Sequence, residues 1–577
     1  MPVNKTRPEK WPEEVPLYME GYEKPLFSLL DDTAGQYPQL TYTIYQGASR
    51  SYATVKETTE KVAGFLMEKG VKKGDKVAIF LPNIPQFPEI FFGILKAGAV
   101  CVNCNPLYTA DELNFQLKDC GARFVFCMDH PEFYPTAVAA AQNTQIETVI
   151  ICGVKSYLPA IKGFLGGLLG KIPKADHYEP GYLFFDDLIK NSKTPTEFPA
   201  INPVEDMAMV LYTSGTTGRP KGACLTHANM VFAVRCLHDW VYTQEKPGEK
   251  AKKISTGGSH VFLGILPWYH IFGLWTCMFW PCLTGNSVVC IPDPRNGTPP
   301  FTEALQSIEK YKVSIFAAVP SIFTAITNHA HLGKYDLSSI IACASGAAPL
   351  ATETLKRFEK ATGAVIFEGY GLSEFLPIGI NPTNLNDRKI GSVGMPCIGT
   401  SVKIVDLETG LEELPQGEDG EIAASGPQMM QGYLNRPDTE ETDFRTIDNE
   451  RYFLTGDIGH IDVEGYLIIT DRKKDMILVG GFNVYPAEVE EALISHPKVA
   501  LAAVIGIPGE DKKESVRAYV QLSPGETATQ EEILEHCKNR LSGYKHPRSV
   551  EFRDEIPTSI VGKVVRRVLK EEVVGKK

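Results

Sequence analysis

A segment rich in glycine and hydroxyl residues, LYTSGTTGRPKG at 211–222, has the composition of a phosphate-binding loop. Gly215 and Lys221 have the spacing of the first Gly and the Lys in the Walker pattern, but Pro220 replaces its second Gly and Gly222 replaces its Mg²⁺-binding Ser or Thr. Pro220 also removes an N–H group and resists the close helical wrap of a Walker loop. The segment therefore predicts a mobile loop that grips phosphate while the Mg²⁺ ligand lies elsewhere. Taken alone, it is also compatible with a surface turn.

Two further motifs supply what this loop lacks. EGYGLSE, 368–374, places Tyr370 between glycines, where the ring can lie against a purine, and ends in Glu374, a carboxylate suited to Mg²⁺. LTGD ends in Asp457, which can accept hydrogen bonds from both ribose hydroxyls. Each motif alone is weak evidence, but the three together in this order indicate a nucleotide site.

Length, charge and cysteine usage narrow the class of protein. A chain of 577 residues is too long for one simple core and predicts two or more domains. Its net charge of −12 disfavours a nucleic-acid binder, which needs a basic face to replace counterions. Thirteen scattered cysteines and a polar, Pro-rich N-terminus without a signal-peptide core predict a cytoplasmic protein.

The elements that must position these motifs follow a βαβ pattern. Short β-branched runs, KVAIFLP, RFVFCMD, TVIICG, MAMVLYT and NSVVCIP, alternate with longer helical patterns and predict mostly parallel sheets. Cys101 and Cys104 form a CxxC without a second ligand pair, and their apolar neighbours favour a buried strand over a metal site. The uncharged stretch 261–292 is cut by prolines and glycines, so we expect a buried strand followed by a core helix rather than a membrane span.

The texture of the sequence changes near Gly391 to Gly-punctuated β segments, and again near Arg472. From Arg472 onward the chain has 18 Lys and Arg against 16 Asp and Glu, so the rest carries −14. We therefore expect an α/β protein: a large N-terminal domain of βαβ layered sheets with a β-subdomain, and a small, more basic α+β C-terminal lid domain.

The motifs resemble the ordered signatures of the AMP-forming adenylating superfamily of acyl-CoA synthetases, luciferases and peptide-synthetase adenylation domains. The matching segments are YTSGTTGRPKG, LPWYHIFG, EGYGLSE, YFLTGDIG, DRKKDMILVGGFNVYPAEVE and IPTSIVGKVVRR. DRKKDMILVGGFNVYP is most similar to bacterial long-chain fatty-acid CoA ligases. The resemblance implies that a carboxylate attacks the α-phosphate of ATP to give acyl-AMP and pyrophosphate, and that CoA then converts acyl-AMP to acyl-CoA and AMP.

The resemblance also implies residue roles, with Mg²⁺ as cofactor and ATP and CoA as cosubstrates. It implies an adenylating domain at 1–470 and a mobile domain at 471–577 that turns about Asp471. Catalytic roles fall on Lys563, which bridges carboxylate and α-phosphate, on Lys221 of the pyrophosphate loop, on Glu374 as the Mg²⁺ ligand, and on His270, which walls the acyl and CoA tunnels. The ATP and AMP contacts fall on Thr213, Ser214, Gly215, Thr216, Thr217, Gly218, Gly346, Ala347, Ala348, Glu368, Gly369, Tyr370, Gly371, Ser373, Asp457 and Arg472. Pantetheine passes close to Gly480 and Gly481. Some relatives carry CoA-binding lysines where this chain has MILVGG, so the groups that bind the CoA nucleotide stay open.

The acyl substrate is less sharply defined. The apolar, aromatic segments His270 to Trp280 and VPSIFTAI favour an uncharged fatty acid of medium to long chain over a dicarboxylate or an amino acid. Branched or aryl acids, a luciferase-type reaction and carrier-protein loading remain alternatives. A noncatalytic nucleotide-binding regulator is disfavoured because Lys563 and Glu374 are both present.

One amphipathic segment stands apart from the nucleotide motifs. In Leu158 to Lys174, LPAIKGFLGGLLGKIPK, apolar residues recur at helical spacing and lysines flank them. This pattern fits a peripheral membrane contact and a packed core helix equally well. The sequence does not define the oligomeric state, and a homodimer stays open.

Overall fold

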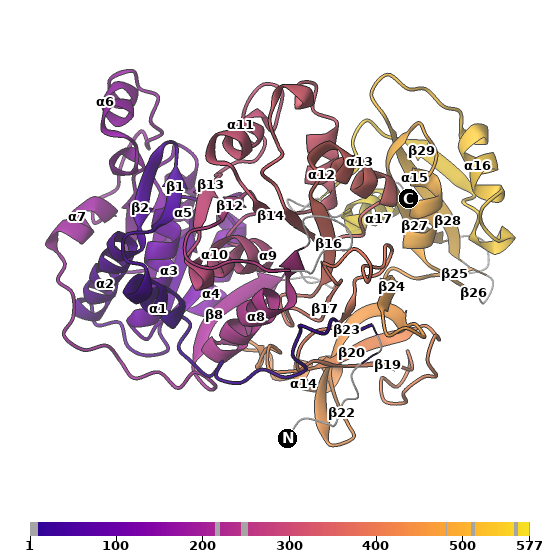
Figure 1. Ribbon diagram of the computed structural model, residues 1–577, viewed down its shortest axis with the longest axis horizontal. Helices are drawn as coiled ribbons and strands as arrows, with labels where there is room; N and C mark the ends of the chain where they lie inside the picture. Colours follow the sequence, from indigo (N-terminus) through magenta and orange to yellow (C-terminus); the bar gives the residue numbers. More distant parts are fainter. Residues whose placement is uncertain are drawn as a thin grey trace.

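The computed structural model describes Pro8 and residues 10–213, 220–243, 252–479, 482–508, 514–558 and 564–575. Two large sheets form the body of the molecule, and a five-stranded and a three-stranded sheet follow them along the chain (Figure 1). This arrangement confirms the predicted α/β class with its β-subdomain and its smaller α+β C-terminal part.

The first large sheet is mainly parallel and has the strand order β21-β9-β8-β4-β3-β5-β6-β7. Its central strands are almost wholly buried, as expected where helices cover both faces of a parallel sheet. The five β-branched runs are all strands, four of them in this sheet, and Cys101 lies in a buried one, as predicted. The strands are β3 (Lys76–Phe80), β4 (Val100–Asn103), β5 (Phe124–Met128), β6 (Thr148–Cys152), β7 (Leu183–Phe184), β8 (Met207–Thr213), β9 (Lys221–Thr226) and β21 (Gly432–Tyr433).

The second large sheet has the order β18-β17-β16-β15-β14-β12-β13-β1-β2 and shares one hydrophobic core with the first. Its strands are β1 (Thr41–Tyr45), β2 (Ala48–Ser51), β12 (Val261–Gly264), β13 (Ser287–Cys290), β14 (Ile315–Ala318), β15 (Ala342–Ser345), β16 (Val365–Tyr370), β17 (Gly379–Ile380) and β18 (Met395–Pro396).

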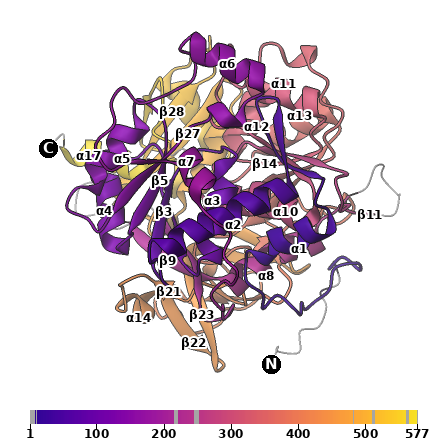
Figure 2. The ribbon, with the colours of Figure 1, turned by 90° about the vertical axis from the view of Figure 1, so that its left-hand side faces the viewer.

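Helices cover the faces of these two sheets. Figure 2 shows α1, α2 and α3 crossing the end of the body that faces the viewer. The helices are α1 (Ser28–Gln36), α2 (Tyr52–Glu68), α3 (Gln86–Lys96), α4 (Ala110–Cys120), α5 (Phe133–Ala141), α6 (Ala160–Leu168), α7 (Phe185–Asn191), α8 (His227–Trp240), α9 (Ile271–Gly273), α10 (Trp280–Thr284), α11 (Thr302–Tyr311), α12 (Pro320–Thr327) and α13 (Thr352–Thr362).

The uncharged stretch 261–292 is buried in this body. It runs from β12 through α9, a π-helical turn at Leu274–Phe279 and α10 into β13, so the expected buried strand and core helix are confirmed. The π-helical turn was not predicted. Within the described residues, no helix combines the length and hydropathy needed to cross a bilayer.

The β-subdomain is a five-stranded antiparallel sheet that lies below the body in Figure 1. It comprises β19 (Ser401–Val405), β20 (Gly420–Ser425), β22 (Phe444–Ile447), β23 (Glu450–Ile461) and β24 (Leu467–Arg472), with α14 (Thr439–Asp443) beside β22.

The C-terminal part has its own three-stranded sheet and its own apolar clusters. Its elements are the hairpin β25 (Ile477–Val479) and β26 (Phe482–Val484), α15 (Pro486–Ile494), β27 (Val499–Pro508), β28 (Glu514–Leu522), α16 (Gln530–Lys538), β29 (Ser549–Phe552) and α17 (Arg566–Gly575). Figure 1 places it at the opposite end of the long axis from α6 and α7.

Candidate active site

The predicted phosphate loop connects β8 to β9, which pair antiparallel in the first sheet. Thr213 ends β8 and pairs directly with Lys221, the first residue of β9. The loop residues Ser214, Gly215, Thr216, Thr217 and Gly218 lie outside the described residues. The two ends of the loop are therefore fixed by strand pairing, which holds one hydroxyl and one ammonium at its base.

Glu374, the predicted Mg²⁺ ligand, lies against this base. Its side chain is buried, and its Oε1 accepts a hydrogen bond of 2.7 Å from the hydroxyl of Tyr433. Burial raises the pKa of Glu374, while hydrogen bonds from Tyr433 and Thr213 act in the opposite direction. The Tyr433 hydroxyl therefore fixes one oxygen of this carboxylate.

Lys221 belongs to the same cluster. Its Nζ lies 4.8 Å from the centre of the Tyr433 ring and 3.3 Å from Oδ2 of Asp443. Tyr433 therefore contacts both the predicted metal ligand and the predicted phosphate-binding cation. Sequence reasoning missed Tyr433 and Asp443, and their only signal is an aromatic after a glycine in QGYLNRP and one acid among several in DTEETD.

The chemistry of this cluster fits Mg²⁺. Mg²⁺ prefers oxygen ligands and is commonly bound through one or two carboxylates together with waters and substrate phosphates. Glu374 supplies one such carboxylate beside the phosphate loop, and among the described residues no group of three or more acidic, His or Cys side chains is arranged to hold an ion. The described residues therefore suit an ion that is coordinated jointly by Glu374 and the nucleotide phosphates, rather than one coordinated by protein side chains alone.

The two loops predicted to enclose adenine leave neighbouring parallel strands side by side. The register pairs Ser345 at the end of β15 with Glu368 in β16, so Gly346, Ala347 and Ala348 follow next to Gly369 and Tyr370. Ala347 has a left-handed backbone, φ 68°. The N–H of Leu350 donates to Oε1 of Glu368 at 3.4 Å, and burial raises the pKa of Glu368 to about 7.

The remaining glycine of EGYG makes a close turn. A Cβ at Gly371 would lie 2.5 Å from Cδ1 of Leu376, so only glycine fits there without a shift. Ser373, two residues after Gly371 and directly before Glu374, is half-buried.

Tyr370, Asp457 and Arg472 form one hydrogen-bonded chain. The hydroxyl of Tyr370 donates to Oδ2 of Asp457 at 2.7 Å, and Nε of Arg472 lies 2.9 Å from Oδ1. Strand pairing sets the second contact, because Asp457 in β23 is directly opposite Arg472 in β24. A ribose that binds Asp457 must therefore share the carboxylate oxygens with Tyr370 and Arg472 or displace these two side chains.

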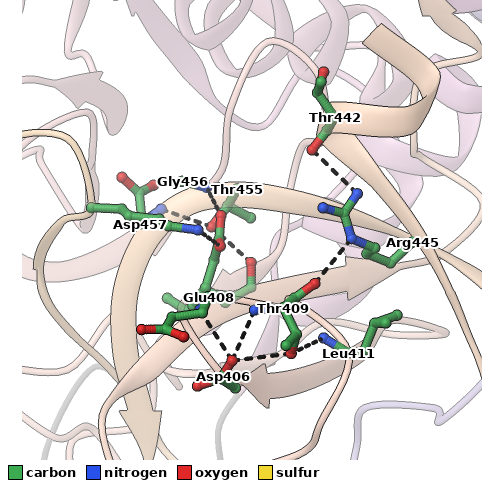
Figure 3. Close-up of polar contacts among 12 residues, drawn as sticks. Asp406, Glu408, Thr409, Leu411, Thr442, Arg445, Thr455, Gly456 and Asp457 are labelled. Atoms are coloured by element: carbon green, nitrogen blue, oxygen red, sulfur yellow. Dashed lines mark hydrogen bonds and ion pairs between the residues drawn. The ribbon is translucent and has the colours of Figure 1, made fainter.

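The turn that presents Asp457 is itself fixed by hydrogen bonds (Figure 3). The N–H of Asp457 donates to Oγ1 of Thr455 at 3.1 Å, and that hydroxyl donates to the carbonyl of Ile422 at 2.8 Å. The N–H of Gly456 donates to Oε1 of Glu421 at 3.2 Å. The sheet thus positions the carboxylate before any ligand binds.

Asp471, the predicted hinge, connects β24 to the C-terminal part. Its buried carboxylate accepts 2.8 Å from the N–H of Ala487 in the first turn of α15 and 2.6 Å from the N–H of Arg472. Beyond it, Lys473 reaches back to Glu421 of the β-subdomain at 2.7 Å. The predicted CoA residues Gly480 and Gly481 and the predicted catalytic Lys563 lie outside the described residues.

His270 stands at the start of the apolar wall. Its Nδ1 accepts a hydrogen bond of 3.3 Å from the N–H of Phe272, which caps α9, and the π-helical turn follows directly. A Cβ at Gly346 would lie 3.1 Å from Cζ of Phe272, so this wall touches the loop predicted to enclose adenine. The acyl and nucleotide motifs therefore meet at Gly346.

Comparison with known proteins agrees with this arrangement. The family model "AMP-binding enzyme" matches residues 30–434, and "AMP-binding enzyme C-terminal domain" matches residues 488–563. A long-chain-fatty-acid–CoA ligase of Bacillus subtilis (strain 168) is 37% identical, covering 98% of this chain and 97% of its own length. A ligase of the same name from Escherichia coli O6:H1 is 34% identical and covers 98% of both chains.

Solved structures give the same result. ATP-bound MatB from Rhodopseudomonas palustris superposes with a TM-score of 0.79 at 28% identity, over 95% of this chain and 98% of its own. The anthranilate CoA ligase AuaEII, in complex with anthranoyl-AMP, superposes with a TM-score of 0.82 at 27% identity, over 98% of this chain and 99% of its own. The chain therefore belongs to the AMP-binding enzymes and is an acyl-CoA ligase of that family.

Proposed function

We propose that this acyl-CoA ligase acts on fatty acids of medium to long chain and that the cluster at Glu374 serves the adenylation step. The full-length similarity to long-chain-fatty-acid–CoA ligases carries this proposal. The uncharged, buried stretch around Phe272 supports it, because an alkyl tail is favoured by an apolar surface.

In the proposed site, Thr213 and Lys221 hold the pyrophosphate portion of ATP. Glu374 would bind Mg²⁺, which when bound neutralises phosphate charge. Asp457 and Arg472 hold the ribose, Tyr370 lies along the adenine, and His270 with Phe272 borders the acyl chain. Lys563 stabilises the charge that develops on the α-phosphate oxygens.

We further propose that residues 471–577 turn about Asp471 between the two half-reactions. Asp471 is followed by Lys473, whose ion pair with Glu421 joins the C-terminal part to the β-subdomain. A turn about this point must exchange such contacts while few backbone angles change. In the second orientation, Gly480 and Gly481 leave room for pantetheine.

The location we propose is the cytoplasm. All thirteen cysteines are free thiols and all are buried, which supports a reducing compartment.

The substrate proposal is tested by pyrophosphate release from a panel of acids in the presence of ATP and CoA. Saturated fatty acids of medium to long chain should give the highest kcat/KM. A higher value for an aryl acid, a dicarboxylate, an amino acid or acetate would refute the fatty-acid proposal and leave the ligase reaction intact.

The residue roles are tested by measuring each half-reaction separately. Lys563→Ala should slow adenylation by about 10² or more and leave conversion of supplied acyl-adenylate to acyl-CoA within a few-fold. Gly481→Leu should do the reverse. Lys570→Ala is the matched control, since Lys570 is 3.8 Å from Asp475 on the C-terminal part. Equal loss of both steps in Lys563→Ala and Gly481→Leu contradicts the alternation.

A further inference from the structure

Helix α6, Ala160–Leu168, presents an apolar face to solvent. Ile161, Phe164, Leu165, Leu168 and Leu169 are 76%, 69%, 46%, 74% and 64% exposed. The first four follow the i, i+3, i+4, i+7 spacing of one helix face, and Leu169 caps the helix. A packed core helix was one of the two expectations for this segment, and these exposures rule it out.

The exposed face is part of a compact hairpin rather than a frayed end. Gly170 has φ 63°, the N–H of Lys171 donates to the carbonyl of Gly166 at 2.8 Å, and the N–H of Gly170 donates to Gly167 at 3.3 Å. This is a Schellman ending, which reverses the chain. A Cβ at Gly166 would lie 3.1 Å from Cγ1 of Ile172, so the returning chain packs directly on the helix.

The base of the hairpin is anchored in the body. Tyr157, one turn before α6, is buried and donates to Oε2 of Glu89 at 2.5 Å, and Arg50 lies 2.6 Å from the other oxygen of that carboxylate. The guanidinium also stacks 4.7 Å from the centre of the Tyr157 ring. The apolar face is therefore held outward by a buried polar network at its base.

The segment that carries this face is basic, with one acid directly after it, Asp176, and one beside its start, Asp186, which accepts a hydrogen bond from Ser156 at 3.0 Å. Residues 155–175 contain four lysines, at 155, 162, 171 and 174, and no Asp or Glu, although the whole chain carries −12. All four lysines are exposed. Figures 1 and 2 both show α6 at the outer edge of the molecule.

We propose that α6 is a membrane-docking element that inserts its apolar face into the surface of an anionic lipid bilayer. Exposed apolar side chains in a segment with four exposed lysines match the boundary between acyl chains and anionic headgroups, where amphipathic helices lie in the plane of the membrane. A second copy of the chain is a poorer match, because docking one such face on another would bring the lysines together. The benefit of docking to the enzyme rests on the proposed function, because long-chain fatty acids accumulate in a bilayer.

The test uses the full-length protein without substrates, sedimented with phosphatidylcholine vesicles with and without phosphatidylglycerol. Wild type should bind the anionic vesicles. Phe164→Ser/Leu168→Ser should weaken binding by tenfold or more. The matched control Leu411→Ser/Val463→Ser removes two other exposed apolar side chains, 48% and 87% exposed, and should bind as wild type does.

Two further variants leave the apolar face in place. Lys171→Gln/Lys174→Gln should lower the partition constant on anionic vesicles by about fivefold per lysine at low salt, with little change on neutral ones. Phe164→Trp should show a blue shift of indole emission on anionic vesicles. Each variant should release pyrophosphate from a detergent-dispersed acid as wild type does.

Failure of the wild type to bind would overturn the docking element. So would an equal loss in the control, or a change from dimer to monomer in Phe164→Ser/Leu168→Ser by sedimentation velocity, since that places a second copy on the face. If Phe164→Ser/Leu168→Ser does not fold, the lysine and tryptophan variants decide. If the protein binds anionic vesicles as expected but does not act on fatty acids, the substrate proposal is refuted and the docking element is not.

Discussion

At the scale of residues, Tyr433 is the contact that ties the phosphate loop to the metal ligand. We predict that Tyr433→Phe moves the acidic limb of the pH profile of kcat/KM for ATP upward by about one unit. Burial already raises the pKa of Glu374, and the Tyr433 hydroxyl counteracts it, so its removal keeps the carboxyl protonated to higher pH. A hydrogen bond to a charged group contributes about 1.5–3 kcal/mol, and about 1.4 kcal/mol corresponds to one pH unit.

The control for this prediction is Tyr212→Phe, which removes a hydroxyl bonded to Asp119 at the same distance, 2.7 Å. Its pH profile should stay where it is in wild type. An unshifted limb in Tyr433→Phe, measured by pyrophosphate release, contradicts the positioning role.

The residue scale also shows where sequence reasoning ends. Glu374, Lys221 and Asp457 stand in local motifs with recognisable composition, so their chemistry could be predicted. Tyr433 is 59 positions from Glu374, and Asp443 is 222 positions from Lys221. Tyr433 reaches its place because β21 pairs with the edge of β9, and Asp443 lies in the short helix α14. Elements of two and five residues leave almost no periodic signal in the sequence.

At the scale of elements, helix α8 is joined to the N-terminal segment through a buried imidazole. Nδ1 of His227, the first residue of α8, accepts a hydrogen bond from the N–H of Leu26 at 2.9 Å. Burial lowers the pKa of His227 from its ordinary value of 6.5 to about 4. In the unfolded chain His227 therefore binds a proton below about pH 6.5, whereas in the folded chain it binds that proton only below about pH 4.

We predict that protonation of His227 lowers the unfolding free energy by up to about 3 kcal/mol as the pH falls from 6.5 to about 4. Above pH 6.5 this contribution should not change with pH. His227→Asn keeps an acceptor but does not titrate, so its urea midpoint should depend less steeply on pH. His331→Asn, at an exposed position, is the control and should keep the wild-type slope. Equal slopes in all three proteins would count against the prediction.

Elements differ in how far the sequence determines them. The parallel strands were predictable because burial on both faces makes them continuous apolar runs. The π-helical turn at Leu274–Phe279 was not, since every residue there is buried and a single polar residue, Thr276, leaves no polar face that reports the period. For α6 the pattern was visible but its partner was not, because an amphipathic stripe looks the same against a core and against a lipid surface.

At the scale of the whole molecule, the C-terminal part has a core separate from that of the body. Leu493 in α15 is fully buried in this smaller cluster, and Leu95 in α3 is fully buried in the main one. We predict two calorimetric unfolding transitions. Leu493→Ala should lower one of them by about 10 °C or more, because such truncations cost about 2–5 kcal/mol and act here on a small unit.

Leu95→Ala is the matched variant and should lower the other transition only. Scanning calorimetry of the three proteins distinguishes the possibilities. One transition that both substitutions shift together would show that the two parts unfold as a single cooperative unit.

The packing of Gly222 limits which side chains can follow Lys221. A Cβ at this position would lie 2.6 Å from Cγ1 of Val210 and 3.2 Å from the Tyr212 ring on the paired strand. The serine or threonine that completes a Walker loop is therefore sterically barred by the β8–β9 hairpin itself. A hydroxyl-bearing side chain at position 222 would therefore need a second change, one that makes room at Val210, before it could serve as a metal ligand.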